Sequence, residues 1–193
     1  DSTENYTNKP LISFSKIKTF SNIKRFDGLI IPRNNKGNLS GGAMIFNRSF
    51  SNLGFPIPFE LANEDKWLVL HALYLDNISV KHTSAIGSYF RIHDNNSSIK
   101  LDSFLEKNEL MHRRFIVYRI FLNKYKNMLN RGVISELEAQ DIAEKLRYEG
   151  KWISILFIQN INIRQKLRFI IYSNSFFYKI RMKMFSLFSG WGI

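Results

Sequence analysis

The chain has 193 residues, 45% of them hydrophobic, with 17 Phe, 8 Tyr and 3 Trp, and it has no Cys. This apolar content is sufficient for a folded core and excludes an intrinsically disordered chain. The absence of Cys excludes disulfides, thiolate metal sites and a cysteine nucleophile. The N-terminal residues show no signal-peptide pattern. The longest apolar runs, 152–158 and 169–172, fall far short of the roughly 18–20 residues of a membrane span.

The formal net charge of +12 is unevenly distributed along the chain. Residues 1–98 carry 11 Lys and Arg against 8 Asp and Glu, whereas residues 151–193 carry 7 against none. A basic C-terminal segment is expected to meet an anionic partner, either nucleic acid or an anionic membrane surface.

The N-terminal half predicts short strands separated by turns. Residues 1–27 indicate a loop followed by a short strand or helix, and residues 28–32 a buried strand ended by Pro32. After a turn-rich loop at 33–38, Gly41 and Gly42 lead into an apolar strand that ends at Phe46. This pair indicates either an ordinary tight turn or a close approach of the backbone to a ligand. A short helical turn is predicted from Asn47 to about Gly54.

Asn63 is the predicted N-cap of a largely buried helix from Glu64 to about Leu75, with acidic residues in its first turn. Two strands are predicted after it, at 78–81 and 88–92, from their alternating apolar and β-branched residues. The order strand, loop, helix, strand is typical of an α/β layer.

The second half predicts helices. Residues 101–128 show helical spacing compatible with two helices. Ser135-Glu136-Leu137-Glu138 matches a capping box, which predicts a helix to about Tyr148 that ends at Gly150. Further helical segments are predicted at 152–172 and 176–188. The predicted fold class is therefore α/β with a helical C-terminal region, and the two regions are residues 1–98 and 99–193.

The acidic pair Glu64-Asp65 has two explanations. Acidic side chains at a helix start are favoured by the helix dipole, which is a purely structural role. A carboxylate that is fixed, partly desolvated and directed into a cleft can instead act as a general base. Trp67 and the Pro-rich approach at 55–58 would supply the rigidity that the second role needs.

His93 follows the predicted strand 88–92 and is either a structural histidine or a metal ligand, because neutral imidazole is a common metal donor. His71, His82 and His112 have no partners at ligand spacing and are expected to be structural or exposed. The chain lacks the nucleophile-elbow, phosphate-loop, zincin and dinucleotide-binding motifs. It also lacks a recognisable nucleic-acid-binding signature, so nucleic acid is not the expected partner.

Three segments, GGAMIFNR, NEDKW and YFRIHDNN, together resemble the C-terminal half of the GT-A-fold, family 2 glycosyltransferases. The similarity is to the rhamnosyltransferase-like enzymes of bacterial surface-polysaccharide and cell-envelope synthesis. That family shows a glycine-led M-x-F-x-R strand, an acidic pair followed by Trp, and a late Y-R-x-H-x-x-N ending, in this order. The match covers residues 28–98, about a third of the chain.

The resemblance implies a role for each matched residue. Asp65 would be the catalytic base that takes the proton of the acceptor hydroxyl, with Glu64 beside it. His93 would bind the divalent metal, Mg²⁺ or Mn²⁺, that holds the nucleotide diphosphate. The resemblance also implies that Gly41, Gly42, Arg91 and Trp67 lie at the substrates. The implied partners are a nucleotide-sugar donor and a glycan or lipid-linked acceptor.

The chain departs from the family pattern in two ways. It contains no Asp-x-Asp metal motif and has only 27 residues before Gly28, so most of the nucleotide-binding half of a GT-A sheet is missing. In addition, Tyr89-Phe90-Arg91-Ile92-His93 has one residue more between Tyr and Arg than the family pattern. We therefore expect a fragment of a longer enzyme, inactive without the missing half.

The segment 169–191 combines aromatic and aliphatic residues with Arg and Lys and has no acid. This composition is typical of a helix in the membrane interface, and it is equally that of a core-packing helix with a solvated basic face. The first explanation predicts a cytoplasmic protein, peripheral on the inner face of the cytoplasmic membrane. The competing functional class is a non-enzymatic basic module that binds nucleic acid, a membrane surface or a partner protein.

Overall fold

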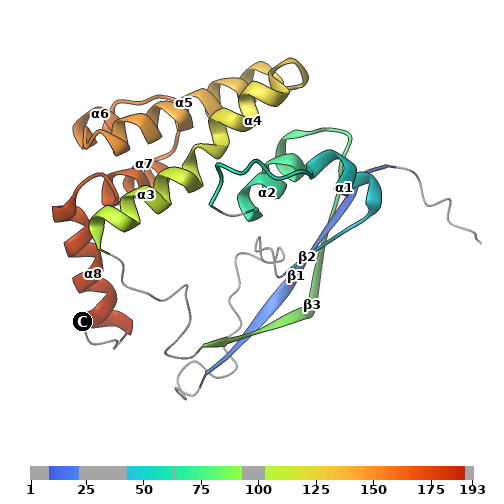
Figure 1. Cartoon of the computed structure of the whole chain (residues 1–193), viewed down its shortest axis with the longest axis horizontal. Helices are drawn as coiled ribbons and strands as arrows, with labels where there is room; N and C mark the ends of the chain where they lie inside the picture. The colour runs from blue at the N-terminus through green and yellow to red at the C-terminus, as the bar shows by residue number, and fades with distance from the viewer. Residues whose placement is uncertain (1–8, 22–42, 63, 93–102, 190–193) are drawn as a thin grey trace, which may run out of the picture. The chain divides into compact units, whose positions relative to one another are not determined.

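The computed structural model describes residues 9–21, 43–62, 64–92 and 103–189 (Figure 1). The chain divides into two compact units. The sheet unit comprises Asp1–Pro58 and Asn63–Lys100, and the helical unit comprises Phe59–Ala62 and Leu101–Ile193. The fold is mixed α/β, with a small three-stranded mixed sheet followed by a mostly helical region, which confirms the predicted class.

The sheet consists of β1 (Leu11–Ser21), β2 (Met44–Phe46) and β3 (Ser79–Ile92) in the order β2-β1-β3. β2 runs antiparallel to β1, and β3 runs parallel to it. A parallel strand requires a crossover connection. The connection from β1 to β3 provides this crossover. It includes β2 and, between β2 and β3, the helices α1 (Arg48–Gly54) and α2 (Asp65–Tyr74), both drawn in Figure 1. The predicted strand at 28–32 lies outside the described residues.

β3 is one strand, whereas the sequence predicted two. Its pairing with β1 is irregular, because Phe14 faces His82 whereas Lys16 faces Ile86, so β3 contains extra residues in this stretch. Small and polar residues at 83–87 weaken the strand pattern there and explain the wrong prediction. The irregularity includes a close approach, since a Cβ atom on Gly87 would lie 2.6 Å from the Cβ atom of Ser15. Only glycine fits at position 87.

The core of the sheet unit is built from one long strand and two helices. α2 is buried at five successive positions, from Trp67 to His71, which confirms the prediction of a largely buried helix. The largest buried apolar side chains in this unit are Ile12, Phe14, Phe50, Trp67, Leu68, Leu70 and Leu75.

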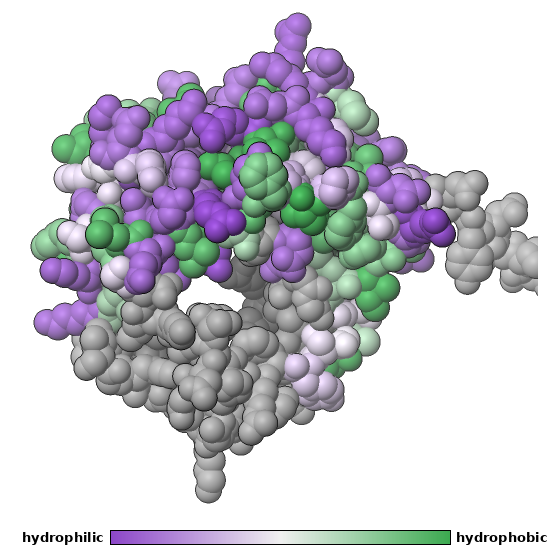
Figure 2. Space-filling model, in the orientation of Figure 1, coloured by the Kyte–Doolittle hydropathy of each residue, from purple (hydrophilic) through white to green (hydrophobic). Residues whose placement is uncertain are grey.

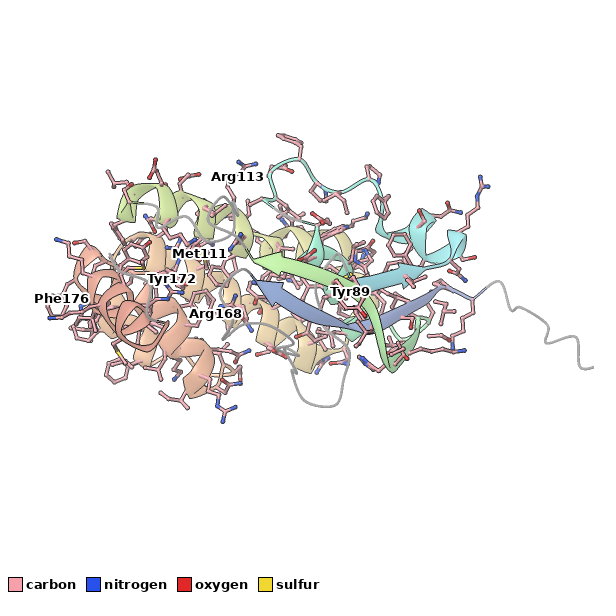
Figure 3. All side chains as sticks on the ribbon, turned by 90° about the horizontal axis from the view of Figure 1, so that it is seen from below. Tyr89, Met111, Arg113, Arg168, Tyr172 and Phe176 are labelled. Atoms are coloured by element: carbon pink, nitrogen blue, oxygen red, sulfur yellow. The ribbon has the colours of Figure 1, made fainter. Side chains whose placement is uncertain are left out.

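The helical unit contains seven helical segments among the residues that the structure describes. They are α3 (Phe104–Phe115), α4 (Val117–Tyr125), the 3₁₀ helix η4 (Lys126–Met128), α5 (Arg131–Tyr148), α6 (Trp152–Leu156), α7 (Ile163–Ile171) and α8 (Ser175–Ser189). The two helices predicted within 101–128 are confirmed as α3 and α4. Residues 152–172, predicted as one helical segment, form α6 and α7 with a loop between them. The loop 59–62 belongs to this unit, and the Nε of Arg113, labelled in Figure 3, donates to the Glu60 carbonyl oxygen at 3.3 Å.

Side-chain caps determine where these helices begin. The Ser103 hydroxyl accepts from the Glu106 N–H while the Glu106 carboxylate accepts from the Ser103 N–H, which forms a capping box. Hydrogen bonds from the Ser103 hydroxyl and N–H hold the pKa of the Glu106 carboxyl below its ordinary value. α5 begins at Arg131, because the Asn130 side chain accepts from the Val133 N–H at 2.9 Å.

The predicted helix start at Ser135 is therefore wrong, although the predicted end at Tyr148 is confirmed. Ser135 lies inside α5, and its hydroxyl accepts from the Asn160 side chain at 2.7 Å. The Ser-x-x-Glu spacing that matches a capping box also occurs within helices, so the pattern alone does not locate the start.

A buried ion pair joins three parts of the helical unit. Arg147 and Glu144, both on α5, have exposed side-chain fractions of 0% and 1%, and the Arg147 Nε donates to the Glu144 carboxylate at 2.7 Å. Arg147 also donates to the Asn108 side chain on α3 and to the Tyr172 carbonyl oxygen after α7. His112 on α3 donates from Nδ1 to the same carboxylate at 2.9 Å. The pair therefore fixes α3, α5 and the α7–α8 turn together.

Candidate functional site

The two acidic residues at the start of α2 differ in their exposure to solvent. The helix begins at Asp65, and the N-cap is Glu64, whose side chain makes no capping hydrogen bond. The prediction that Asn63 is the N-cap is therefore wrong, and Asn63 itself lies outside the described residues. Asp65 is half-buried in the first turn, whereas Glu64 is exposed. Of the two carboxylates, only Asp65 has the partial desolvation and the helical backbone that a positioned base needs.

Trp67 anchors the first turn of α2. Its side chain is fully buried, and its indole N–H donates to the Gly54 carbonyl oxygen at 2.7 Å. This bond joins the end of α1 to the start of α2. The resemblance placed Trp67 at the substrate, but a side chain with 0% exposure has no free surface for a ligand. The structure supports a positioning role for Trp67 instead of a contact with substrate.

His71 extends this anchor by one turn. Its Nδ1–H donates to the Trp67 carbonyl oxygen at 2.8 Å, and its ring meets the Trp67 ring edge-on at a centroid distance of 4.7 Å. The ring of Phe50 on α1 lies 6.3 Å from the His71 ring. The expectation of a structural His71 is confirmed by its full burial among these groups.

Gly54 allows α1 and α2 to lie close together. A Cβ atom there would come within 2.9 Å of the Leu68 Cδ2 atom, which is closer than carbon atoms normally approach. The peptide bond that follows, Phe55–Pro56, is cis. The end of α1 is thus held by packing and by the Trp67 indole, and both contacts bear on the turn that carries Asp65.

Asn47 fixes the other end of α1 to the sheet. Its side-chain oxygen accepts from the Phe50 N–H at 3.0 Å and from the Leu11 N–H at 3.1 Å, and its Nδ2 donates to the Lys9 carbonyl oxygen at 3.0 Å. The sequence predicted the helical turn after Asn47 and missed these links to β1. The cap preference of Asn was the available signal, but hydrogen bonds across more than 30 residues leave no local pattern.

The remaining predicted site residues are not brought together with Asp65 by any described contact. Gly41, Gly42 and His93 lie outside the described residues. Arg91 lies in β3, where its backbone is in register with Phe20 of β1. The structure does not describe its side chain. The roles that the resemblance implies for these four residues therefore stay predictions.

No metal site forms within the described residues, among which no group of three or more His, Asp or Glu could hold an ion. The described part of the chain on its own does not fit the predicted Mg²⁺ or Mn²⁺ site. A metal would need His93 together with ligands from residues beyond this description.

The basic C-terminal segment is part core and part surface. Phe169 and Ile170 of α7 and Tyr178 of α8 are buried, so the prediction that 169–191 faces a membrane is too broad at its start. Exposed apolar residues occur both before and after these positions. No helix in the described ranges has the length and apolar content to cross a membrane.

No protein-family model, no curated protein and no solved structure matches this chain.

Proposed function

We propose that the chain is the acceptor-side part of an inverting glycosyltransferase. The enzyme would transfer a sugar from a nucleotide-sugar donor to a hydroxyl of a glycan or lipid-linked acceptor, with Asp65 as the general base. The observation that carries the proposal is the placement of Asp65, half-buried on the first turn of a helix that Trp67 and Gly54 clamp. A carboxylate fixed in this way meets the positional requirement of a general base.

The order of motifs along the sheet unit supports the same function. The M-x-F-x-R segment corresponds to β2 and the start of α1, the acidic pair to the start of α2, and the Y-x-R segment to the end of β3. All three belong to the sheet unit. A family active site assembled from these motifs would thus draw all three from one compact unit.

The proposed chemistry needs one base on the acceptor side. The Asp65 carboxylate takes the proton of the acceptor hydroxyl while the hydroxyl oxygen forms a bond to the anomeric carbon of the donor sugar. The bond from that carbon to the diphosphate oxygen breaks, and its electron pair leaves with the nucleoside diphosphate. Such proton removal contributes typically 10²- to 10⁴-fold to the rate.

Glu64, exposed next to Asp65, would contact the acceptor or shape its loop. Arg91 is proposed to lie near the donor phosphates, and Gly41 and Gly42 close to the donor or the acceptor, in keeping with the resemblance. Because the described residues do not form a metal site, no step of this mechanism is assigned to a metal. The proposed location is cytoplasmic and peripheral, at the inner face of the cytoplasmic membrane, where a lipid-linked acceptor would be met.

The test is substitution of Asp65 in the protein encoded by the whole reading frame. Asp65→Asn keeps the size of the side chain and removes its basicity, so the rate of nucleoside diphosphate release with acceptor is expected to fall by about 10²-fold or more. Donor binding and thermal stability should stay close to those of the wild type. Asp76→Asn, the same substitution at an exposed position after α2, is the matched control and should retain most of the activity.

Transfer by the Asp65→Asn variant within about twofold of the wild-type rate would refute the assignment. The proposal also predicts βαβ units and an Asp-x-Asp motif upstream of Asp1 in the reading frame. A reading frame without them would contradict a GT-A parent enzyme.

A further inference from the structure

α8 exposes an apolar stripe beside a basic one. Phe176, Ile180 and Met184 recur every four residues, which places them along one side of the helix, and all three are exposed. Lys179 and Lys183 have the same spacing, are exposed, and lie on the neighbouring strip of the helix surface. Figure 3 shows Phe176 at the periphery of the helical unit.

α7 repeats this arrangement with different residues. Ile163 and Leu167 are exposed at a spacing of four, and Arg164 and Arg168 follow each of them directly. The Arg168 guanidinium lies 5.1 Å from the Phe115 ring centroid, yet the residue remains exposed. Two successive helices thus present the same pairing of aliphatic and cationic side chains.

α6 extends the apolar surface toward the N-terminus. Ile153, Leu156 and Phe157 at and beyond this short helix are exposed, Phe157 to 79%. The Trp152 ring lies 5.3 Å from the Phe177 ring, which joins α6 to α8. We name the exposed apolar and basic residues of the three helices the α6–α8 surface. On the face drawn in Figure 2, hydrophobic residues lie interspersed with hydrophilic ones over the helical unit.

The charge and the apolar content of the α6–α8 surface together indicate which kind of partner it binds. Residues 151–193 carry 7 Lys and Arg and no Asp or Glu. Two copies of such a surface would repel each other, which disfavours self-association. A nucleic acid would use the cations but would leave Ile163, Leu167 and Ile180 in water. An anionic bilayer takes up both kinds of group, since aliphatic side chains enter the acyl boundary while Lys and Arg meet the headgroups.

We infer that the α6–α8 surface binds the surface of an anionic lipid bilayer. The surface begins near residue 152, well before the segment 169–191 that the sequence indicated, and it excludes the buried Phe169 and Ile170. The inference does not rest on glycosyl transfer, and vesicle binding is measured without any sugar substrate.

The experiment is sedimentation of the 193-residue chain with large unilamellar vesicles of phosphatidylcholine alone or with a quarter phosphatidylglycerol. Binding is expected to the anionic vesicles and to weaken as salt is raised. Lys179→Gln/Lys183→Gln should lower the partition coefficient by about 30-fold at low salt, from about fivefold per cation near an anionic leaflet. Ile180→Ser/Met184→Ser and Ile163→Ser/Leu167→Ser should each lower it by about tenfold or more, because each pair removes apolar area that the bilayer would cover.

Met128→Ser and Arg131→Gln are the matched controls, because both residues are exposed in the helical unit outside the α6–α8 surface. Both should bind like the wild type, and far-UV circular dichroism should show that every variant is folded. Equal binding to neutral and anionic vesicles would overturn the inference, as would binding unchanged by either apolar pair. Retention on a 20-nucleotide RNA, or dimers in sedimentation equilibrium, without vesicle binding would also overturn it.

Discussion

The two units satisfy their buried polar groups in different ways. In the sheet unit, the described buried side chains Ser15, Trp67 and His71 each donate to a backbone carbonyl oxygen. In the helical unit, the buried Ser173 also donates to a backbone carbonyl oxygen, but the largest buried polar side chain, Arg147, meets a charged partner, Glu144. The uncharged donors of the sheet unit hold segments of the backbone in place. The buried ion pair of the helical unit holds several helices together.

This difference separates the residues that could serve function from those that maintain the fold. Two of the three backbone-directed bonds of the sheet unit, those of Trp67 and His71, lie in the helix that carries Asp65. The ion pair of the helical unit is fully buried and lies among helices, so it has no access to a substrate. We therefore expect substitutions in the helical unit to affect mainly stability, and small changes in the sheet unit to affect geometry at the candidate site.

The largest expected effect comes from breaking the ion pair. Arg147→Met leaves the Glu144 carboxylate buried without its main partner, and removal of one member of such a pair costs about 3–5 kcal/mol. Hydrogen exchange followed by mass spectrometry should show lost protection in α3 and α5, with β1 and α2 close to the wild type. Loss of protection in the sheet unit alone would contradict the division of roles.

The double variant Glu144→Leu/Arg147→Met sharpens this test. Replacing both charges with apolar side chains leaves neither ion uncompensated, so the double variant should be more stable than Arg147→Met. If the double variant were less stable than the single one, the hydrogen bond from His112 to Glu144, which only the double variant removes, would matter more than the charge balance.

A smaller effect is expected from Gly87→Ala in the sheet unit. The added methyl group would lie 2.6 Å from the Ser15 Cβ atom, and this atom is attached directly to the β1 backbone and cannot rotate away. The strands would have to separate locally, at a cost of about 1–3 kcal/mol. Chemical denaturation followed by the fluorescence of a Trp152→Phe/Trp191→Phe background, which leaves Trp67 as the reporter, would measure this. Ser15→Gly in the same chain should recover part of the loss, and Gly87→Ala with wild-type stability would show that β3 is paired differently.

The sequence predicted elements where local patterns are strong. Three such patterns are the helical spacing of 101–128, the apolar run of α2 and the cap preference of Asn47. Each of them involves residues that are only a few positions apart along the chain. The prediction failed where the structure depends on distant partners. β3 crosses a bulge that only its register with β1 reveals, and Asn130 rather than Ser135 caps α5, although both residues have suitable side chains.

The candidate site was predictable only in part. The acidic pair and the tryptophan stand out as residue types, and the resemblance assigns roles to them. The burial that removes Trp67 from contact with substrate arises from the packing of α1 on α2. The half-burial that distinguishes Asp65 from Glu64 is likewise a property of the folded chain. Neither residue's own neighbourhood in the sequence carries that information.

The smallest effects are expected when an Asn that caps a helix is replaced by Ala, once in each unit. Asn47 and Asn130 both cap a helix, but Asn47 also bonds to Leu11 and Lys9 of the sheet unit, whereas the Asn130 cap bond is local. An N-cap Asn replaced by Ala typically costs about 1 kcal/mol, so Asn130→Ala should lower stability by about that much. Asn47→Ala should cost about 2 kcal/mol, since it also leaves the Leu11 N–H without its partner. Denaturant midpoints of the two variants measure the difference. Equal losses would mean that the bonds from Asn47 to Leu11 and Lys9 add nothing to the cap.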